Sequence, residues 1–348
     1  MIRSMGRSTL GRALASVAAQ DVEEVEIVVV LASGREHPPL QHRFGALPIT
    51  QVATQAPLPR AAAADAGIRA AHGRWITFLD DDDEFLPGHL AGLSASAAAA
   101  PERARAVTGR ALATFSDGRT EVWGQRFAVA ELYRRNFIHL STLLFHRSLL
   151  DAGIAFDHAL ELHEDWDFAL QLAQHTQFAD WPQPTFRWYA DVGASGGGGG
   201  GNVDDAACAA QRDVVYRKWA PVRDAWLERC IEGMHRAAAH AAAGRLGEAE
   251  SAARAILAFS QNDPHALNLL AMLAARQGRL RDALDFQSLA VEVSPHDADL
   301  RFNLANVHLA RADRRAALSA LEATLALDSA HAGAVARLRE LNALPTPV

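Results

Sequence analysis

The sequence predicts an α/β domain followed by an all-α repeat region, and three observations indicate this fold class. Strand-like and helix-like segments alternate over about the first 200 residues, as expected of a mostly parallel sheet with flanking helices. Four consecutive aspartates, Asp80 to Asp83, follow the apolar run 75–79. From about Val203 the chain is helical in pattern, rich in alanine and periodic. We therefore expect two structurally different parts.

Composition excludes several classes of protein. The 348 residues are 49% hydrophobic and 22% charged, as in ordinary globular domains, and the formal net charge is −7. No block rich in lysine or arginine occurs, which argues against nucleic acid or an anionic membrane as the main partner. Cys208 and Cys230 have no metal-ligand spacing, and no apolar stretch approaches the roughly 20 residues of a membrane span. These features predict a cytoplasmic protein.

The elements of the α/β part follow from local patterns. Ser8 or Thr9 caps a helix with apolar residues at 10, 13, 14, 17 and 18. The β-branched run 26–31 reads as a buried strand. The other expected segments are a helix at 60–71, a strand at 75–79, a helix from Pro87 to about 99, a turn at 116–119 between strands, and a helix starting near Asp165. The glycine run 196–201 is either a loop that closes over a site or a linker.

The C-terminal part has a period of 34 residues. Ala237, Ala271 and Ala305 recur at this interval, as do the alanines at 249, 283 and 317. Gly244 and Gly278 are followed at the same step by Ala312. The pattern resembles the tetratricopeptide repeat, a pair of antiparallel helices, and the alternative is a plain alanine-rich bundle. We expect an α/β domain at 1–202, a helical linker at 203–229 and repeats at 230–345.

Two acidic clusters are candidate functional sites. The first ends a predicted buried strand, and the carboxyl ends of such strands open onto a crevice in α/β sheets. Crowded carboxylates need a positive charge, and Mg²⁺ or Mn²⁺ shared with a substrate diphosphate fits this need. The second cluster, 163–167, precedes a helix. The alternatives are a solvated loop for the first cluster and ordinary helix capping for the second.

The order of these motifs over residues 1–200 resembles that of family 2 glycosyltransferases with the GT-A fold. The resemblance is carried by the segments 3–7, 18–20, 27–31, 73–83 and 163–167. It implies an inverting, hexosyltransferase-like enzyme that moves a sugar from a nucleoside diphosphate donor to an acceptor hydroxyl. The resemblance also implies a divalent cation, Mn²⁺ or Mg²⁺, at the first cluster.

The resemblance also implies roles for individual residues. Asp82 is the expected principal metal ligand, together with Asp80. Asp165 is the expected catalytic base, and Glu164 orients the acceptor or supports the base. The expected donor-binding residues are Arg3, Ser4, Arg60, Asp81 and Asp83. The expected acceptor-binding residues are Trp166 and His139, with core packing as the alternative for both.

The sequence departs from the family pattern at two places. Leu31 and Ala32 stand where an aspartate usually recognises the nucleoside base. Ala64 and Asp65 replace an arginine–asparagine pair, with Arg60 one turn earlier as a substitute for the charge. These departures favour an alternative, an inactive GT-A-fold scaffold that serves as an interaction protein. A nucleotidyltransferase is a third possibility, for which 3–7 is a weak phosphate loop.

The expected partners follow from this interpretation. They are a nucleotide-sugar donor, a polysaccharide, lipid-linked sugar or protein as acceptor, and a protein bound by the repeats.

Overall fold

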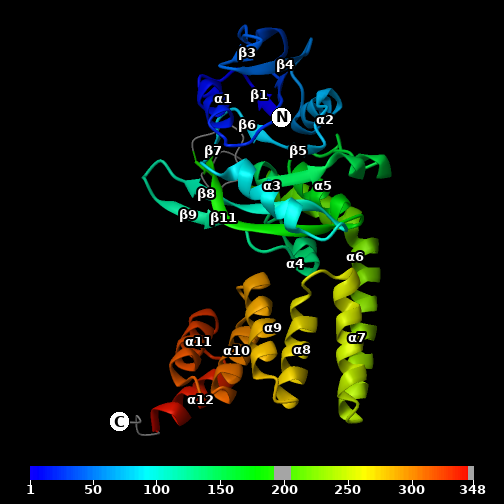
Figure 1. The fold of residues 1–348 in the computed structure, drawn as a ribbon, viewed down its shortest axis with the longest axis vertical. Coiled ribbons are helices and arrows are strands. Elements are labelled where there is room, and N and C mark those ends of the chain that lie inside the picture. Colours follow the sequence, from blue (N-terminus) through cyan, green and yellow to red (C-terminus); the bar gives the residue numbers. More distant parts are fainter. Residues whose placement is uncertain (192–204, 344–348) are drawn as a thin grey trace. The chain divides into compact units, whose positions relative to one another are not determined.

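The structure is a computed structural model that describes residues 1–191 and 205–343 (Figure 1). The chain forms two compact units. The sheet unit consists of Met1–Arg126 and Arg135–Ala220, and the helical unit consists of Phe127–Arg134 and the chain from Pro221 onward. The predicted glycine loop at 196–201 lies outside the described residues.

The first sheet has five strands in the order β3-β4-β2-β1-β6. The strands are β1 (Ile2–Ser4), β2 (Ile27–Leu31), β3 (Arg43–Phe44), β4 (Leu47–Ala53) and β6 (Leu79–Asp80). Strands β4, β2, β1 and β6 are parallel, whereas β3 is antiparallel to β4. Because β1 pairs with β6, Arg3 lies in register beside Asp80. The carboxyl ends of the parallel strands therefore meet at one edge, as the sequence predicts.

Helices cover both faces of this first sheet. On one face, Ile27 and Val29 of β2 belong to the same buried cluster as Leu14 of α1 (Leu10–Ala18). On the other face, Val30 is buried in a cluster with Ala63 of α2 (Arg60–Ala70). Burial on both sides explains why β2 is a continuous apolar run rather than an alternating one.

The apolar run 75–79 forms two short strands instead of the one predicted. β5 (Trp75–Thr77) pairs with β10 in the second sheet, whereas β6 pairs with β1 in the first. Phe78 lies between them and packs in the core against Phe145, with ring centroids 6.0 Å apart. The run thus passes from one sheet to the other and delivers the aspartates where both sheets contribute residues.

The second sheet has the order β5-β10-β8-β11-β7, with β9 paired to β8. Its further strands are β7 (Glu84–Phe85), β8 (Ala104–Thr114), β9 (Thr120–Trp123), β10 (Leu143–His146) and β11 (Gln177–Tyr189). β8 and β11 are parallel and the other pairs are antiparallel. The expected mostly parallel arrangement thus describes the first sheet, and the second is mixed. The predicted turn at 116–119 is confirmed, because it joins β8 to β9.

The remaining helices of the sheet unit begin close to their predicted positions. α3 (His89–Ala99) packs on β8 and β11, and it starts after Gly88 rather than at Pro87. Gly88 has φ of +80°, a conformation that glycine adopts readily, so it sets the start of the helix. α5 (Glu164–Ala173) carries the second acidic cluster in its first turn. The short 3₁₀ turns are η1 (Gly34–Glu36), η2 (Leu140–Thr142) and η3 (Arg147–Ala152).

The helical unit confirms the 34-residue repeat. After α6 (Asp205–Ala242), the helices are α7 (Leu246–Phe259), α8 (Pro264–Arg276), α9 (Leu280–Val293), α10 (Ala298–Ala310), α11 (Arg314–Leu327) and α12 (Ala332–Ala343). Successive odd-numbered helices from α7 start 34 residues apart, and so do successive even-numbered helices from α8. The alanines at 249, 283 and 317 are fully buried. This is a tetratricopeptide-like solenoid.

The two units do not follow the predicted linear boundaries. The division at Ala220 and Pro221 falls inside α6, whereas the sequence suggested 202 and 229. The segment 127–134 contains α4 (Val129–Arg134) and belongs to the helical unit, although strands of the sheet unit flank it in sequence. Asn262 Nδ2 donates to the Phe127 carbonyl at 2.7 Å, and Ser294 Oγ donates to Glu131 Oε1 at 2.9 Å. These contacts between distant segments are not visible in sequence periodicity.

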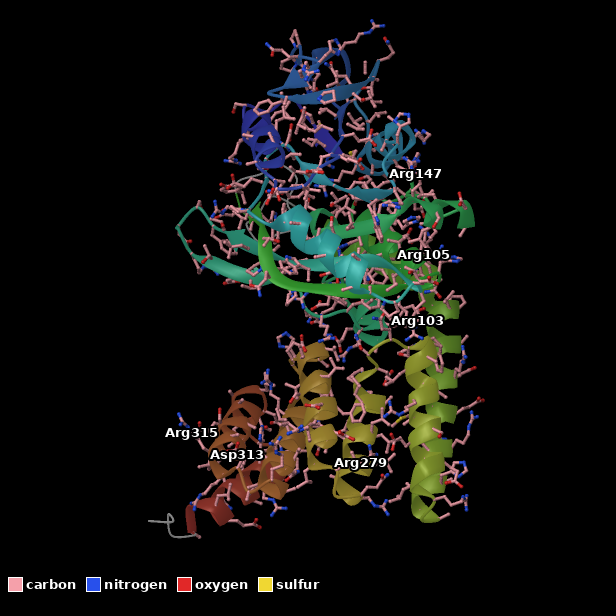
Figure 2. All side chains as sticks on the ribbon, viewed as in Figure 1. Arg103, Arg105, Arg147, Arg279, Asp313 and Arg315 are labelled. Carbon is pink, nitrogen blue, oxygen red and sulfur yellow. The ribbon has the colours of Figure 1, made fainter. Side chains whose placement is uncertain are left out.

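The repeat also explains a strained residue. Gly244, Gly278 and Ala312 each follow a helix end with φ between +60° and +76°. Figure 2 labels Arg279 and Asp313, which come next at equivalent positions in two of the repeats. Both donate their backbone N–H to a carbonyl of the preceding helix, which closes the helix with a Schellman-type turn. Only the alanine pays a steric penalty for this conformation.

We expect Ala312→Gly to raise the free energy of unfolding by about 1 kcal/mol, because glycine adopts this conformation without the steric penalty. Urea denaturation of the full chain measures the change. Gly278→Ala is the matched reverse variant and should lose a similar amount, since no atom lies within 4 Å of the added Cβ and only the backbone is affected. Stabilisation by both variants would contradict this explanation.

Among the described helices, none is at once long enough and apolar enough to cross a bilayer.

Candidate active site

A cavity of about 340 Å³ in the sheet unit contains residues of both acidic clusters. Asp80, Asp82 and Asp83 line it together with Glu164 and Asp165. Asp80 ends β6, Asp82 and Asp83 come after it, and the other two residues start α5. The volume suits a small-molecule site. Two groups about 80 residues apart in sequence thus face one cavity.

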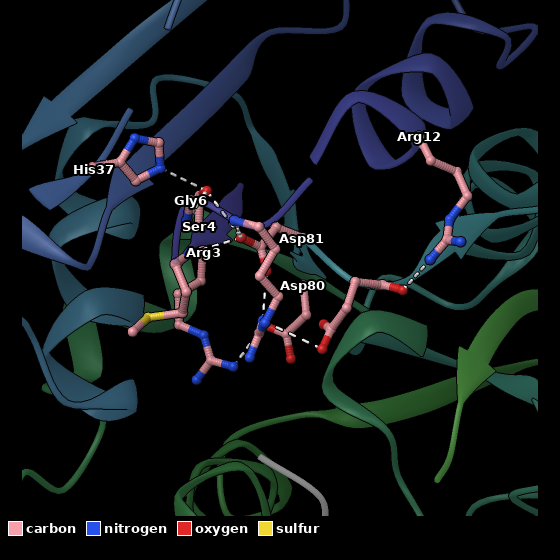
Figure 3. Close-up of polar contacts among 10 residues, drawn as sticks. Arg3, Ser4, Gly6, Arg12, His37, Asp80 and Asp81 are labelled. Atoms are coloured by element: carbon pink, nitrogen blue, oxygen red, sulfur yellow. Dashed lines mark hydrogen bonds and ion pairs between the residues drawn. The ribbon is translucent and has the colours of Figure 1, made fainter. Parts of the chain in front are cut away.

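The aspartates of the first cluster differ in their contacts and burial. Asp80 pairs with Arg3, with Nη2 3.1 Å from Oδ1. The Asp82 side chain is 19% exposed and lies 3.3 Å from the Arg7 guanidinium. Asp83 is almost buried, and its Oδ1 accepts the Tyr189 backbone N–H at 3.0 Å. Figure 3 shows Arg3 beside Asp80, and Arg12 reaching the Asp82 carbonyl.

Asp81 has a structural role, which corrects its predicted contact with the donor. Its carboxylate is fully buried and accepts hydrogen bonds from Ser4 Oγ, Met5 N and the Arg7 guanidinium, at 3.0, 2.7 and 2.5 Å. Ser4 is also fully buried and bonds His37 Nε2 at 2.7 Å (Figure 3). Neither Asp81 nor Ser4 is among the residues lining the cavity. Together they hold the loop between β1 and α1.

The donor set of the first cluster fits a hard divalent cation. Asp80, Asp82 and Asp83 each offer a carboxylate oxygen, and these oxygens lie within 4.8 Å of one another. Burial, reinforced by the charge of Asp80, raises the pKa of Asp82 and raises the pKa of Asp83 well above its ordinary value. The carboxylates therefore gain from a nearby positive charge, and oxygen ligands are those that Mg²⁺ and Mn²⁺ prefer.

The two carboxylates of the second cluster differ in how far they are buried. Asp165 is partly exposed, and its Oδ1 accepts the Trp166 backbone N–H at 2.7 Å. Glu164 is 6% exposed. Burial first, and then the charge of Asp165, raises the pKa of Glu164 to about 7, although Arg60 and Arg3 oppose the shift. Glu164 therefore carries a proton part of the time near neutral pH.

The raised pKa of Glu164 predicts a pH-dependent stability. The folded state binds the proton with a pKa of about 7 and the unfolded state with 4.5, so the stabilisation is complete below 4.5 and is lost as pH rises through 7. Glutamine does not titrate, so the free energy of unfolding of Glu164→Gln minus that of wild type should rise by about 3 kcal/mol as the pH rises from 4.5 to 7. Urea denaturation between pH 4 and 8 measures it. The exposed Glu161→Gln is the control, and parallel pH profiles for Glu164→Gln and wild type would contradict the prediction.

Two arginines supply positive charge at the cavity. Arg3 lies on β1 in register beside Asp80, and Arg60 starts α2. Both line the cavity. The neighbouring Ala64 also lines it, whereas Asp65 instead accepts the Phe156 backbone N–H and pairs with His158.

The two residues expected to bind the acceptor differ in position. Trp166 is 1% exposed and packs edge-on against Tyr216, with ring centroids 5.1 Å apart. It does not line the cavity, so the predicted acceptor contact is corrected to core packing. His139 is partly exposed and lines the cavity.

Several residues of the cavity wall were not predicted as site residues. They include Trp123, Asn136, Trp188, Tyr189 and Cys208. Cys208 lies at the start of α6, where its Sγ is 3.5 Å from His163 Nε2. Both tryptophans lie at or near the end of a strand, and an aromatic residue in a strand is usually interpreted as a core residue. The sequence pattern alone therefore does not mark them as site residues.

The sheet unit is thus an α/β unit with an aspartate cluster at the end of a central strand and a second acidic pair at the start of a helix. Residues 5–155 match the family described as Glycosyl transferase family 2.

Two curated relatives agree with this class. The chain is 34% identical over 77 residues to "Uncharacterized glycosyltransferase YwdF" of Bacillus subtilis (strain 168), covering 22% of this chain and 29% of the relative. It is 30% identical over 175 residues to "Succinoglycan biosynthesis protein ExoO" of Rhizobium meliloti (strain 1021), covering 45% and 50%. The chain thus spans half or less of the length of these relatives.

Solved structures similar to the chain include tetratricopeptide domains. The first such domain of Spaghetti (RPAP3) bound to an HSP90 peptide has a TM-score of 0.32 and 16% identity, covering 33% of this chain and 94% of that one. The Arabidopsis OM64 tetratricopeptide domain has a TM-score of 0.31 and 9% identity, covering 34% and 97%. The assignment of repeats here rests on the 34-residue spacing of the helices themselves.

Proposed function

We propose that the protein is an inverting, metal-dependent glycosyltransferase that moves a sugar from a nucleoside diphosphate donor to an acceptor hydroxyl. The observation that carries the proposal is the single cavity lined by Asp80, Asp82 and Asp83 and by Glu164 and Asp165. One group suits the anionic end of the donor, and the other suits the acceptor.

The roles of the residues follow from the charges that the reaction creates. The acceptor oxygen attacks the anomeric carbon while the bond from that carbon to the phosphate oxygen breaks, and its electron pair leaves with the nucleoside diphosphate. Asp165 takes the proton of the attacking hydroxyl, because an un-ionised hydroxyl is a poor nucleophile. Arg3 and Arg60 stabilise the charge of the leaving group. A divalent cation held by Asp80, Asp82 and Asp83 would add positive charge for the diphosphate.

Glu164 is a poor candidate for the base in this proposal. It is nearly buried, and its raised pKa leaves it partly protonated at neutral pH. A group in that state holds an acceptor hydroxyl or Asp165 in place by hydrogen bonding. We therefore propose that Asp165 is the base and that Glu164 orients the acceptor or supports Asp165.

We further propose that the repeats bind a protein partner or a protein-attached acceptor. Paired helices that stack at a regular interval present an extended surface suited to peptides rather than to small molecules. The names of two relatives are consistent with the transferase, one as a glycosyltransferase and one as a protein of succinoglycan biosynthesis. A polysaccharide or lipid-linked acceptor is compatible with the same cavity.

A panel of nucleotide sugars, each with and without Mn²⁺, tests the proposal by thermal unfolding and donor hydrolysis. We expect at least one donor to stabilise the protein only with Mn²⁺, by about 2.7 kcal/mol at a hundred times its Kd. Asp82→Asn should lose this metal-dependent stabilisation, because it removes a cation ligand. Asp151→Asn, which removes one exposed charge elsewhere, is the matched control. Absence of stabilisation by every nucleotide in wild type would favour the scaffold alternative.

A further inference from the structure

Two tryptophans stand side by side on one face of the second sheet, beside the acidic residues of the cavity. Trp123 of β9 is paired with Ala111 of β8, and Trp188 of β11 is paired with Ala113. Ala111 and Ala113 are two residues apart and therefore share a face of β8. Because both positions carry only a methyl group, the two indoles meet above the strand, with ring centroids 6.1 Å apart.

His139 completes this surface, which we name the aromatic wall (Trp123, His139 and Trp188). The imidazole lies 6.2 Å from the Trp123 ring and 5.4 Å from the Trp188 ring, measured between centroids. All three residues are partly exposed and line the cavity. Phe186 lies beneath His139, 4.6 Å away, and is fully buried. Phe186 packs against the wall from the core, while the three rings line the cavity.

The neutral His139 ring has one N–H to donate. Its Nδ1 accepts the Ser141 backbone N–H at 3.2 Å, so in the neutral ring the proton is on Nε2. Burial lowers the pKa of His139, which keeps the ring neutral. His139 lines the same cavity as Asp80 and Asp165, so the wall adjoins both acidic clusters.

This combination matches a sugar ring. A pyranose has an apolar face of C–H groups and an edge of hydroxyls, so indole faces can stack on the first while an N–H donor binds the second. We infer that the aromatic wall binds a pyranose of the acceptor, so that the acceptor is a carbohydrate rather than a protein side chain. The inference rests on the proposed function for its reaction, but sugar binding by the wall is measurable without the donor.

Saturation-transfer NMR and titration calorimetry with methyl glycosides of glucose, galactose, mannose and N-acetylglucosamine test the inference in the full chain without nucleotide. We expect at least one glycoside to bind, with saturation concentrated on the C–H protons of one ring face. Trp188→Leu keeps an apolar side chain but removes the stacking surface, so affinity should fall about tenfold. Trp188→Phe, which keeps an aromatic face, should lose less than about threefold.

Controls separate loss of the wall from loss of the fold. Trp75→Leu changes a partly exposed tryptophan of β5 outside the cavity lining and should leave glycoside binding unchanged. Thermal stabilisation by nucleotide and Mn²⁺ is measured on the same samples. If Trp188→Leu does not fold, Trp123→Leu and the wild-type saturation pattern give the same test. Binding of no glycoside to wild type, or equal binding by the leucine variants, overturns the inference.

The outcomes distinguish this inference from the proposed function. Metal-dependent nucleotide binding without glycoside binding would leave the transferase proposal standing and exclude the carbohydrate acceptor. Glycoside binding that depends on the wall, in a protein that binds no nucleotide, would support the sugar site and contradict the transferase reaction.

Discussion

Asp165→Asn should lower the rate of donor hydrolysis or sugar transfer by about 10³-fold, since general base catalysis contributes on this order. The amide is close in size to the carboxylate but cannot accept the proton of the attacking hydroxyl. Donor binding should be unchanged, because Asp165 lies in the second cluster and not among the cation ligands. Initial rates at saturating donor, together with nucleotide stabilisation, give the two readouts.

The exposed Glu161→Gln removes one negative charge near the same helix and is the control for this experiment. It should retain wild-type rates. Normal turnover by Asp165→Asn would exclude Asp165 as the base. A parallel loss of nucleotide stabilisation would show instead that the substitution disturbs the whole cavity.

Asp81→Asn should lower the free energy of unfolding by about 3 kcal/mol, a typical cost of removing one partner from a buried ion pair. The carboxylate is fully buried, pairs with Arg7 and accepts hydrogen bonds from the loop that follows β1. An asparagine leaves part of this set unsatisfied and leaves Arg7 without its closest counter-charge. Urea denaturation at neutral pH, without metal, measures the loss.

Asp82→Asn is the matched comparison, since it changes the neighbouring residue in the same way. Its carboxylate faces the cavity and crowds against Asp80, so without metal the substitution should cost little stability. The two adjacent variants thus separate a structural carboxylate from a ligand. Equal destabilisation by both would contradict the division of roles.

The acidic site shows which features of a site the sequence pattern can predict. The strand before Asp80 and the helix at Glu164 are local features that the sequence pattern predicts, whereas the assignment of both clusters to one site came from the resemblance to the family. Asp81 nevertheless lies outside the cavity that Asp80 and Asp82 line, and its carboxylate is fully buried. That burial, and the orientation of Trp166 into the core, depend on which elements pack around the residues.

The sequence by itself determined the 34-residue helix pairs, the position of the two acidic clusters and the class of the sheet unit. Each depends on spacing along the chain, which local propensity and periodicity record. Only the tertiary structure decided that 75–79 divides between two sheets, that 127–134 packs in the helical unit, and that Trp123 and Trp188 form one wall with His139. These features join residues far apart in sequence, and their contacts are specified by packing that no single segment contains.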